Sequence, residues 1–190
     1  MEGIRPQAGA QERFLSSSAD IAIYGEAAGG GKSFALLMEP LRHIGNEHFG
    51  GVIFRRTSPQ ITNEGALWDE AGKLYPLVGG DARVGSLEYK FPSGSSVSFR
   101  HLQYEATKHD WQGAQVAFIG FDELTHFTKL QFFYMLSRNR STCCVRQLGA
   151  AQVPAHVGDN APAERHAHAA LAELYWPQRH ANPEPLSCED

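Results

Sequence analysis

The feature that most constrains the fold is a glycine-rich segment, residues 25–33, which lies between an apolar run and a helical pattern. Residues 21–24 form the apolar run and predict a short buried strand, while residues 32–43 carry apolar side chains at helical spacing. Pro40 is expected to end or kink this helix near Glu39. Glycines that end in Gly-Lys-Ser between a strand and a helix are typical of a phosphate-binding P-loop.

The residues of this loop have separate expected roles toward a nucleotide. Glycines let successive backbone N–H groups curl around phosphate oxygens, and the helix N-terminus adds favourable partial positive charge. We expect Lys32 to neutralise the β- and γ-phosphates and the hydroxyl of Ser33 to coordinate Mg²⁺. The glycines expected to bind the nucleotide are Gly25, Gly29, Gly30 and Gly31. The alternative interpretation is a flexible glycine turn that Ser33 caps.

Glu26 departs from the P-loop pattern. The motif G-x-x-x-x-G-K-S requires a glycine five positions before Gly31, where this chain has Glu26. A carboxylate about 4 Å from a phosphate charge is repelled by about 1 kcal/mol in water and by about 4 kcal/mol at an effective dielectric constant of about 20. Unless Gly25 takes the turn or the side chain points to solvent, we expect Glu26 to weaken nucleotide binding.

A second motif consists of two consecutive acidic residues. Residues 116–121 predict a buried strand that runs directly into Asp122 and Glu123. This is the Walker B pattern of P-loop ATPases, in which Asp122 would hold Mg²⁺ and Glu123 would polarise the attacking water. Alone, an acidic pair after a strand is more often a helix cap. Because this pair follows the P-loop by about 90 residues that contain strands and helices, a metal–nucleotide site is favoured.

Strands and helices alternate along the rest of the first 146 residues. The expected strands are residues 21–24, 51–54 and 116–121, and the expected helices are residues 32–43, 67–75 and 129–138. Residues 86–91 and 95–101 alternate apolar and polar side chains around a Pro-Ser-Gly turn, which predicts an antiparallel hairpin. The pattern indicates an α/β fold of the P-loop NTPase type, with a mainly parallel sheet flanked by helices and the hairpin as an insertion.

The composition changes after residue 146. Residues 147–190 contain no Phe, Ile or Lys, and their 2 basic against 6 acidic side chains account for the whole net charge of −4. We therefore expect an incomplete P-loop ATPase domain in residues 1–146 and a mobile tail without a core-building strand in residues 147–190. Within this tail, residues 161–176 can form an alanine-rich helix that Pro177 stops.

The overall composition excludes several classes of protein. A chain of 190 residues, 42% of them apolar, is long enough for one domain with a packed core. It has no apolar run long enough for a membrane span and no signal-peptide pattern. Its 3 cysteines lack metal-ligand spacing and suggest no disulfide framework, so we expect a cytoplasmic protein without a membrane partner.

Several separated motifs together resemble the ATPase domain of phage terminase large subunits, over about residues 5–146. The segments that carry the resemblance are Gln11-Glu12-Arg13-Phe14-Leu15, residues 25–33, Phe54-Arg55-Arg56-Thr57, Trp111-Gln112-Gly113, Phe121-Asp122-Glu123-Leu124-Thr125-His126 and Leu136-Ser137-Arg138-Asn139-Arg140. The resemblance is specific because these motifs occur in the same order as in the family. It implies a motor that couples ATP hydrolysis to the packaging of double-stranded DNA into a capsid.

The resemblance also implies roles and partners. Gln11 would read the adenine edge, Lys32 and Ser33 would bind the phosphates and Mg²⁺, and Asp122 would hold the metal while Glu123, with Lys32, carries catalysis. The implied partners are double-stranded DNA, a terminase small subunit, a portal protein and further copies of the chain in a homo-oligomeric ring. The implied location is the cytoplasm of the host cell during phage assembly, or that of a cell carrying a prophage.

Two alternatives stay open at this point: another P-loop DNA motor such as a helicase, and a defective truncated fragment with little ATPase activity. The family places a Thr-Cys-Asn-Pro-like coupling motif on the next strand, and no such motif follows Arg146. Five arginines can supply a finger to a neighbouring subunit or contacts with DNA phosphate, although an ordinary surface role is more common for any one of them. They are Arg55, Arg56, Arg100, Arg138 and Arg140.

Overall fold

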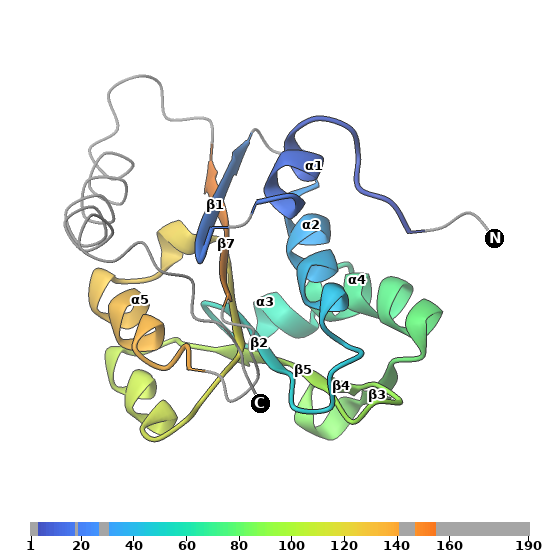
Figure 1. The fold of residues 1–190 in the computed structure, drawn as a ribbon. Helices are drawn as coiled ribbons and strands as arrows, with labels where there is room; N and C mark the ends of the chain where they lie inside the picture. Colours follow the sequence, from blue (N-terminus) through green and yellow to red (C-terminus); the bar gives the residue numbers. More distant parts are fainter. Residues whose placement is uncertain (1–3, 18, 27–30, 141–146, 155–190) are drawn as a thin grey trace, which may run out of the picture.

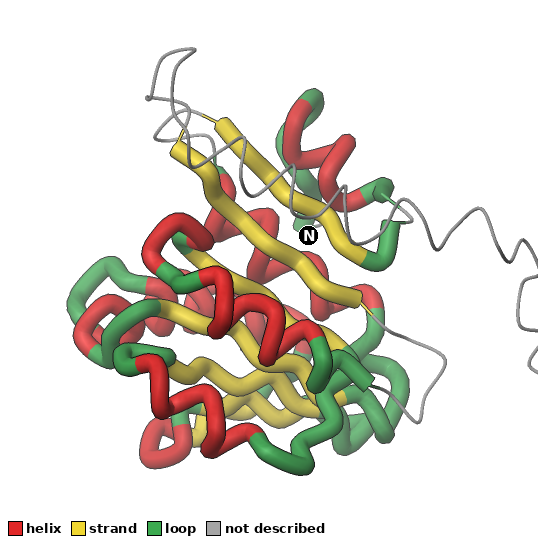
Figure 2. Tube along the Cα trace, turned by 90° about the vertical axis from the view of Figure 1, so that its left-hand side faces the viewer, coloured by secondary structure: helices red, strands yellow, loops and turns green. Residues whose placement is uncertain are grey.

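The computed structural model describes residues 4–17, 19–26, 31–140 and 147–154, which form one seven-stranded sheet with helices on both faces (Figures 1 and 2). The strands are β1 Ile21–Glu26, β2 Gly50–Arg55, β3 Asp81–Arg83, β4 Glu88–Lys90, β5 Ser96–His101, β6 Phe118–Asp122 and β7 Gln147–Pro154. Their order across the sheet is β1-β7-β6-β2-β5-β4-β3. The predicted α/β class is confirmed.

Five neighbouring strands, β1, β7, β6, β2 and β5, run parallel, and β4 and β3 continue the sheet antiparallel. The predicted hairpin is the β4–β5 pair, whose turn is closed by a hydrogen bond of 2.9 Å from the N–H of Gly94 to the carbonyl of Phe91. Gly94 has φ of +100°, a conformation that favours glycine. The sequence did not predict β3, a three-residue edge strand whose residues are all exposed.

The three predicted helices are present as α2, α4 and α5 with shorter bounds, and the sequence did not predict α1 and α3. The α-helices are α1 Ala10–Leu15, α2 Lys32–Met38, α3 Pro59–Thr62, α4 Leu67–Leu74 and α5 Lys129–Leu136, and 3₁₀ turns cover Glu39–Arg42, Tyr75–Val78, Val84–Ser86, Glu105–Trp111 and Leu124–His126. The turn that follows α2 contains Pro40, as the proline predicted. None of the described helices is long and apolar enough to cross a membrane.

The two central strands β2 and β6 bury side chains on both faces of the sheet. Ile53 and Phe118 belong to the core on the side of α2 and α4, whereas Val52, Phe54 and Phe121 pack on the side of α5. In Figure 1, α2 and α4 lie on one side of the sheet and α5 on the other. This burial on both faces explains why each strand is an uninterrupted apolar run in the sequence.

The expectation that no core strand follows residue 146 is wrong. Strand β7 lies between β1 and β6 and pairs parallel with both, so that Leu148 is opposite Ile21 on one side and Ile119 on the other. The segment is rich in glycine and alanine, which gives little apolar signal, but its backbone is paired along both edges. The expected mobility of the tail beyond Pro154 and its helix over residues 161–176 fall outside the described residues.

Candidate functional site

The parallel sheet brings the two sequence motifs to one edge. β1 ends at Glu26, directly before the P-loop segment, and β6 ends at Asp122. Both strands pair with β7 in the same direction, with Glu26 opposite Pro154 and Asp122 opposite Ala151. Because β1, β7 and β6 are parallel, their carboxyl ends lie at the same end of the sheet. Residues that follow β1 and β6 therefore come close together although they are distant in sequence.

Ser33 and Asp122, the two predicted metal ligands, are in direct contact. The hydroxyl of Ser33 donates to the carboxylate of Asp122, with Oγ 3.1 Å from Oδ1 and 3.2 Å from Oδ2. Ser33 lies in the first turn of α2, whereas Asp122 is the last residue of β6. The structure therefore brings together the P-loop serine and the Walker B aspartate, as the motifs predicted.

The carboxylate of Asp122 is fully buried and carries an ion pair that the sequence did not predict. Nη2 of Arg55 lies 2.6 Å from Oδ2 of Asp122, whose side chain is 0% exposed. Burial raises the pKa of Asp122 above its ordinary value, and the neighbouring charge of Glu123 adds to the rise. The charge of Arg55 and the hydrogen bonds from Ser33 and Arg55 act on this pKa in the opposite direction.

Arg55 was one of five arginines without an assigned partner in the sequence. It is the last residue of β2, the strand that pairs with β6 on the side opposite β7. The register places Phe54 opposite Phe121, so the next residues, Arg55 and Asp122, lie beside each other at the carboxyl ends of the two strands. The signal that could have found this pair is two neighbouring parallel strands that end in opposite charges, which requires knowing the strand order.

Gly31 and Lys32 start α2 at the end of the P-loop. Gly31 has φ of +67° and precedes the helix, and Lys32, its first residue, is buried at 6% exposure. Gly25 is exposed within β1. Gly29 and Gly30 lie outside the described residues, and so does the side chain of Glu26. The expected roles of these three residues therefore stay predictions.

Gln11, the residue expected at the adenine, is buried against the end of the P-loop. Its Oε1 accepts a hydrogen bond from the backbone N–H of Gln7 at 2.8 Å, and its Nε2 donates to the carbonyl of Gly31 at 3.0 Å. The side chain is 2% exposed. Both ends of the amide thus contact backbone groups, and Gln11 connects the N-terminal segment to the loop.

A cavity of about 350 Å³ lies between α1 and β1, beside the first glycine of the loop. Its lining residues are Ala10, Arg13, Phe14, Ser17, Ala22, Ile23, Tyr24 and Gly25. The rings of Phe14 and Tyr24 stack at 5.3 Å between centroids. The lining does not include Ser33 or Asp122, so this cavity is separate from the pair of predicted metal ligands.

Glu123, the predicted general base, follows β6 in an unusual backbone conformation. It has φ of +60° and ψ of +62°, a left-handed conformation that costs a residue with a side chain about 1–2 kcal/mol. Its carbonyl accepts from the N–H of His126 at 2.9 Å and so begins the 3₁₀ turn Leu124–His126. Strained residues of this kind concentrate at functional sites, which is consistent with the role expected for Glu123.

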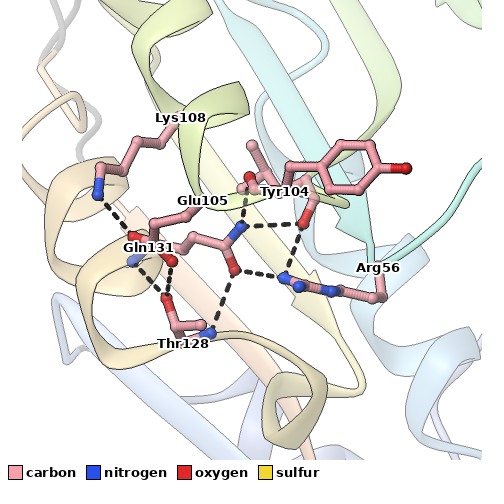
Figure 3. Close-up of polar contacts among 7 residues, drawn as sticks. Arg56, Tyr104, Glu105, Lys108, Thr128 and Gln131 are labelled. Carbon is pink, nitrogen blue, oxygen red and sulfur yellow. Dashed lines mark hydrogen bonds and ion pairs between the residues drawn. The ribbon is translucent and has the colours of Figure 1, made fainter.

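A buried polar network supports the segment after the Walker B turn (Figure 3). Gln131 of α5 is 0% exposed, and its Nε2 donates to the carbonyls of Leu102 at 3.0 Å and Tyr104 at 2.9 Å. Its Oε1 accepts from Nη1 of Arg56 at 2.6 Å and from the N–H of Thr128 at 3.2 Å. The network joins the ends of β2 and β5 to the start of α5.

The sequence contains a signal for part of this network, although the sequence-based predictions did not include it. Thr128 and Gln131 form a capping box, since Oγ1 of Thr128 accepts from the N–H of Gln131 at 3.1 Å in return. Thr-x-x-Gln before an apolar run is the sequence signature of such a box. Oγ1 of Thr128 also donates to Glu105 at 2.7 Å, and Lys108 pairs with Glu105 at 2.5 Å. Glu105 and Lys108 thus extend the network from Thr128 toward the protein surface.

Comparison with known proteins supplies the family. A family model described as "Terminase large subunit, T4likevirus-type, N-terminal" matches residues 23–156, well over half of the chain. The chain belongs to this terminase family. The resemblance stated from the motifs is therefore confirmed, and the match extends past residue 146 through β7. A search of the curated proteins found no match.

Solved structures of large terminases share the fold. The large terminase of the HK97 bacteriophage superposes with a TM-score of 0.60 at 13% identity, covering 80% of this chain and 34% of that one. The large terminase of a thermophilic bacteriophage gives a TM-score of 0.56 at 16% identity, covering 77% and 39%. The complex of that thermophilic phage terminase with ADP gives 0.54 at 15% identity, covering 75% and 37%. The terminase chain described here thus spans less than two fifths of the length of these structures.

Proposed function

We propose that this terminase chain is an ATPase that binds Mg²⁺ and ATP and couples hydrolysis to the packaging of double-stranded DNA into a phage capsid. The observation that carries the proposal is the contact of Ser33 with Asp122, which joins the P-loop helix to the end of β6. Membership of the terminase family supports it, and the complex of the thermophilic phage terminase with ADP is consistent with it.

The geometry of Ser33 and Asp122 fits a magnesium ion. Oxygen ligands that are neighbours in an octahedron lie about 2.9 Å apart when each is about 2.0–2.1 Å from Mg²⁺. The observed separations of 3.1 and 3.2 Å between Oγ of Ser33 and the carboxylate oxygens of Asp122 are close to this value. The pair can therefore hold the ion after small side-chain movements. Bound there, Mg²⁺ would neutralise charge on the phosphates of the nucleotide.

We propose roles for the other expected site residues as well. Lys32, buried at the start of α2, would neutralise the β- and γ-phosphates, and Gly25, Gly29, Gly30 and Gly31 would offer the phosphates close access to the backbone. Glu123, one residue beyond Asp122, would orient the attacking water and accept its proton. We propose Gln11 for the adenine side of the site, because it already contacts the end of the P-loop.

The proposed partners come from the family. We propose that the complete protein acts on double-stranded DNA as a homo-oligomeric ring, together with a terminase small subunit and a portal protein, in the cytoplasm of the host. Membership of the terminase family favours this role over that of a helicase. A duplex-unwinding assay separates the two, because the proposed packaging ATPase should hydrolyse ATP without separating the strands of a short duplex.

Calorimetric titration of the 190-residue chain with ATP-γ-S and Mg²⁺ tests the proposal. We expect binding that Lys32→Ala weakens at least about tenfold, since the variant loses a charge from the phosphate site. Lys73→Ala is the matched control, because Lys73 lies on α4 with an exposed side chain paired to Glu70. Absence of binding by the unaltered chain, or equal loss in both variants, would contradict the proposed function and favour the defective fragment.

A further inference from the structure

The pair formed by Arg55 and Asp122 places a cation on the carboxylate that is expected to bind the metal. β2 delivers the guanidinium, because Arg55 ends this strand directly beside the end of β6. Its backbone is held by pairing with His101 and by a hydrogen bond of 3.2 Å from the N–H of Leu102 to its carbonyl. Only the side chain of Arg55 can therefore move away from Asp122 without disturbing the sheet.

The guanidinium of Arg55 does not use all of its hydrogen-bond donors in its present position. Nη2 is 2.6 Å from Oδ2 of Asp122, whereas Nε is buried and has no hydrogen-bond partner among the described residues. The side chain is 18% exposed, so part of it can be reached from solvent. An arginine with a remaining buried donor is suited to an additional anionic acceptor, and phosphate oxygens are acceptors of this kind.

We propose that Arg55 makes metal binding at Asp122 depend on the nucleotide, an inference that rests on the proposed Mg²⁺–ATP site. Mg²⁺ and Arg55 compete for one buried carboxylate, and the positive charge of Arg55 repels a divalent ion that arrives alone. The phosphates of a nucleotide bring negative charge to the same place and offer acceptors to the guanidinium. Arg55 thus disfavours the free metal and favours the anion.

The test measures binding of each ligand separately in the 190-residue chain. Mn²⁺ replaces Mg²⁺ and is titrated without nucleotide by electron paramagnetic resonance, and ADP is titrated calorimetrically in the presence of EDTA. Arg55→Gln removes the charge and retains a polar side chain. We expect this variant to bind Mn²⁺ at least about fivefold more tightly and metal-free ADP at least about fivefold more weakly, because one positive charge is lost beside both ligands.

Two further variants make the outcome specific. Arg56→Gln is the matched control, because its guanidinium bonds to Gln131 and the carbonyl of Leu102, and it should leave both affinities unchanged. If Arg55→Gln does not fold, Arg55→Met takes its place; it also lacks the positive charge, and a gain in Mn²⁺ affinity is again expected. Mn²⁺ affinity that is unchanged or weaker in the Arg55 variant overturns the inference.

A failure of the proposed function gives a different result from a failure of the inference about Arg55. If the unaltered chain binds neither ADP nor the Mn²⁺–ADP complex, the nucleotide site itself is refuted, and the inference falls with it. If the unaltered chain binds Mn²⁺–ADP but Arg55→Gln loses Mn²⁺ affinity, the site stands. Arg55 would then support Asp122 as a metal ligand instead of competing with the ion.

Discussion

The side-chain amide of Gln11 fills the space that a side chain on Gly31 would need. Nε2 of Gln11 lies 2.1 Å from the position of a Cβ built on Gly31, and it donates to the carbonyl of Gly31 at 3.0 Å. Gly31 also has φ of +67°, a conformation that L side chains rarely adopt. The backbone and the contact with Gln11 thus independently require glycine at the end of the P-loop.

We expect Gly31→Ala to lower the free energy of unfolding by more than Gly65→Ala does. Gly65 is the matched control, because its φ of +73° is similar and no atom lies within 4 Å of its Cβ position. Its alanine should therefore cost only the left-handed backbone, about 1–2 kcal/mol. At position 31, Gln11 must also move. Urea unfolding of both variants checks this.

The double variant isolates the contact itself. Gln11→Ala should make Gly31→Ala less costly, because the alanine Cβ then has no amide to displace. Equal losses in Gly31→Ala and Gly65→Ala, or full additivity in the double variant, would show that Gln11 does not restrict position 31.

Substitution of Glu123 by glycine should change the stability of the fold and the rate of ATP hydrolysis in opposite directions. We expect Glu123→Gly to raise the free energy of unfolding by about 1 kcal/mol, because glycine removes the strain of a positive φ. The same variant should lose ATP hydrolysis, since the carboxylate that orients the water is gone. Thermal unfolding and a phosphate-release assay on one preparation give both results.

Glu123→Gln retains the backbone strain and the polar side chain. We expect it to bind ATP-γ-S normally but to hydrolyse ATP about 10²–10⁴-fold more slowly, since an amide does not accept the proton of the attacking water. Turnover equal to that of the unaltered chain would remove Glu123 as the base. A loss of binding would instead assign it to holding the nucleotide.

The sequence predicted those strands and helices whose own side chains form a recognisable local pattern. β2 and β6 are buried on both faces, which leaves an uninterrupted apolar run, and Pro40 marks the end of α2. β3 and β7 were missed for the opposite reason. β3 is exposed throughout, and β7 contains Gly-Ala-Ala, so neither strand has an apolar pattern of its own. Each is recognised as a strand only by its backbone pairing with neighbouring strands.

The candidate site likewise has residues that local motifs predicted and contacts that they did not predict. Ser33 and Asp122 belong to motifs that can be recognised within a few residues, and the structure brings them into contact. The pair of Arg55 with Asp122 depends on β2 lying next to β6, a lateral order that local sequence patterns do not determine. Gln131 was recognisable as part of a capping box, but its bonds to Arg56 and to two distant carbonyls again follow from packing.

Gln131 should contribute to stability far more than its exposed neighbour on α5. Gln131→Leu has a similar volume but removes the buried hydrogen bonds that Gln131 donates to the carbonyls of Leu102 and Tyr104 and the one that it accepts from Arg56. We expect the free energy of unfolding to fall by about 2–4 kcal/mol. Leu130→Gln, at a position 65% exposed, should change it by less than about 0.5 kcal/mol. Urea denaturation compares them, and equal effects would contradict the network.

The last prediction concerns where the folded sheet ends along the chain. Composition alone placed the limit at residue 146, so that removal of everything after it would change little. The structure reverses this expectation, because β7 lies between β1 and β6 and pairs with both. A chain of residues 1–146 would leave the edges of both strands unpaired and would detach β1, which precedes the P-loop, from the rest of the sheet.

We therefore expect residues 1–146 to aggregate or to unfold without a cooperative transition, whereas residues 1–156 should retain the transition of the 190-residue chain. The longer chain includes β7 and ends where the family match ends. Circular dichroism during urea unfolding and size-exclusion chromatography distinguish the two. If residues 1–146 unfold cooperatively at the same urea concentration as residues 1–156, β7 contributes no stability. The sheet would then be complete without β7, and β1 would need a different partner.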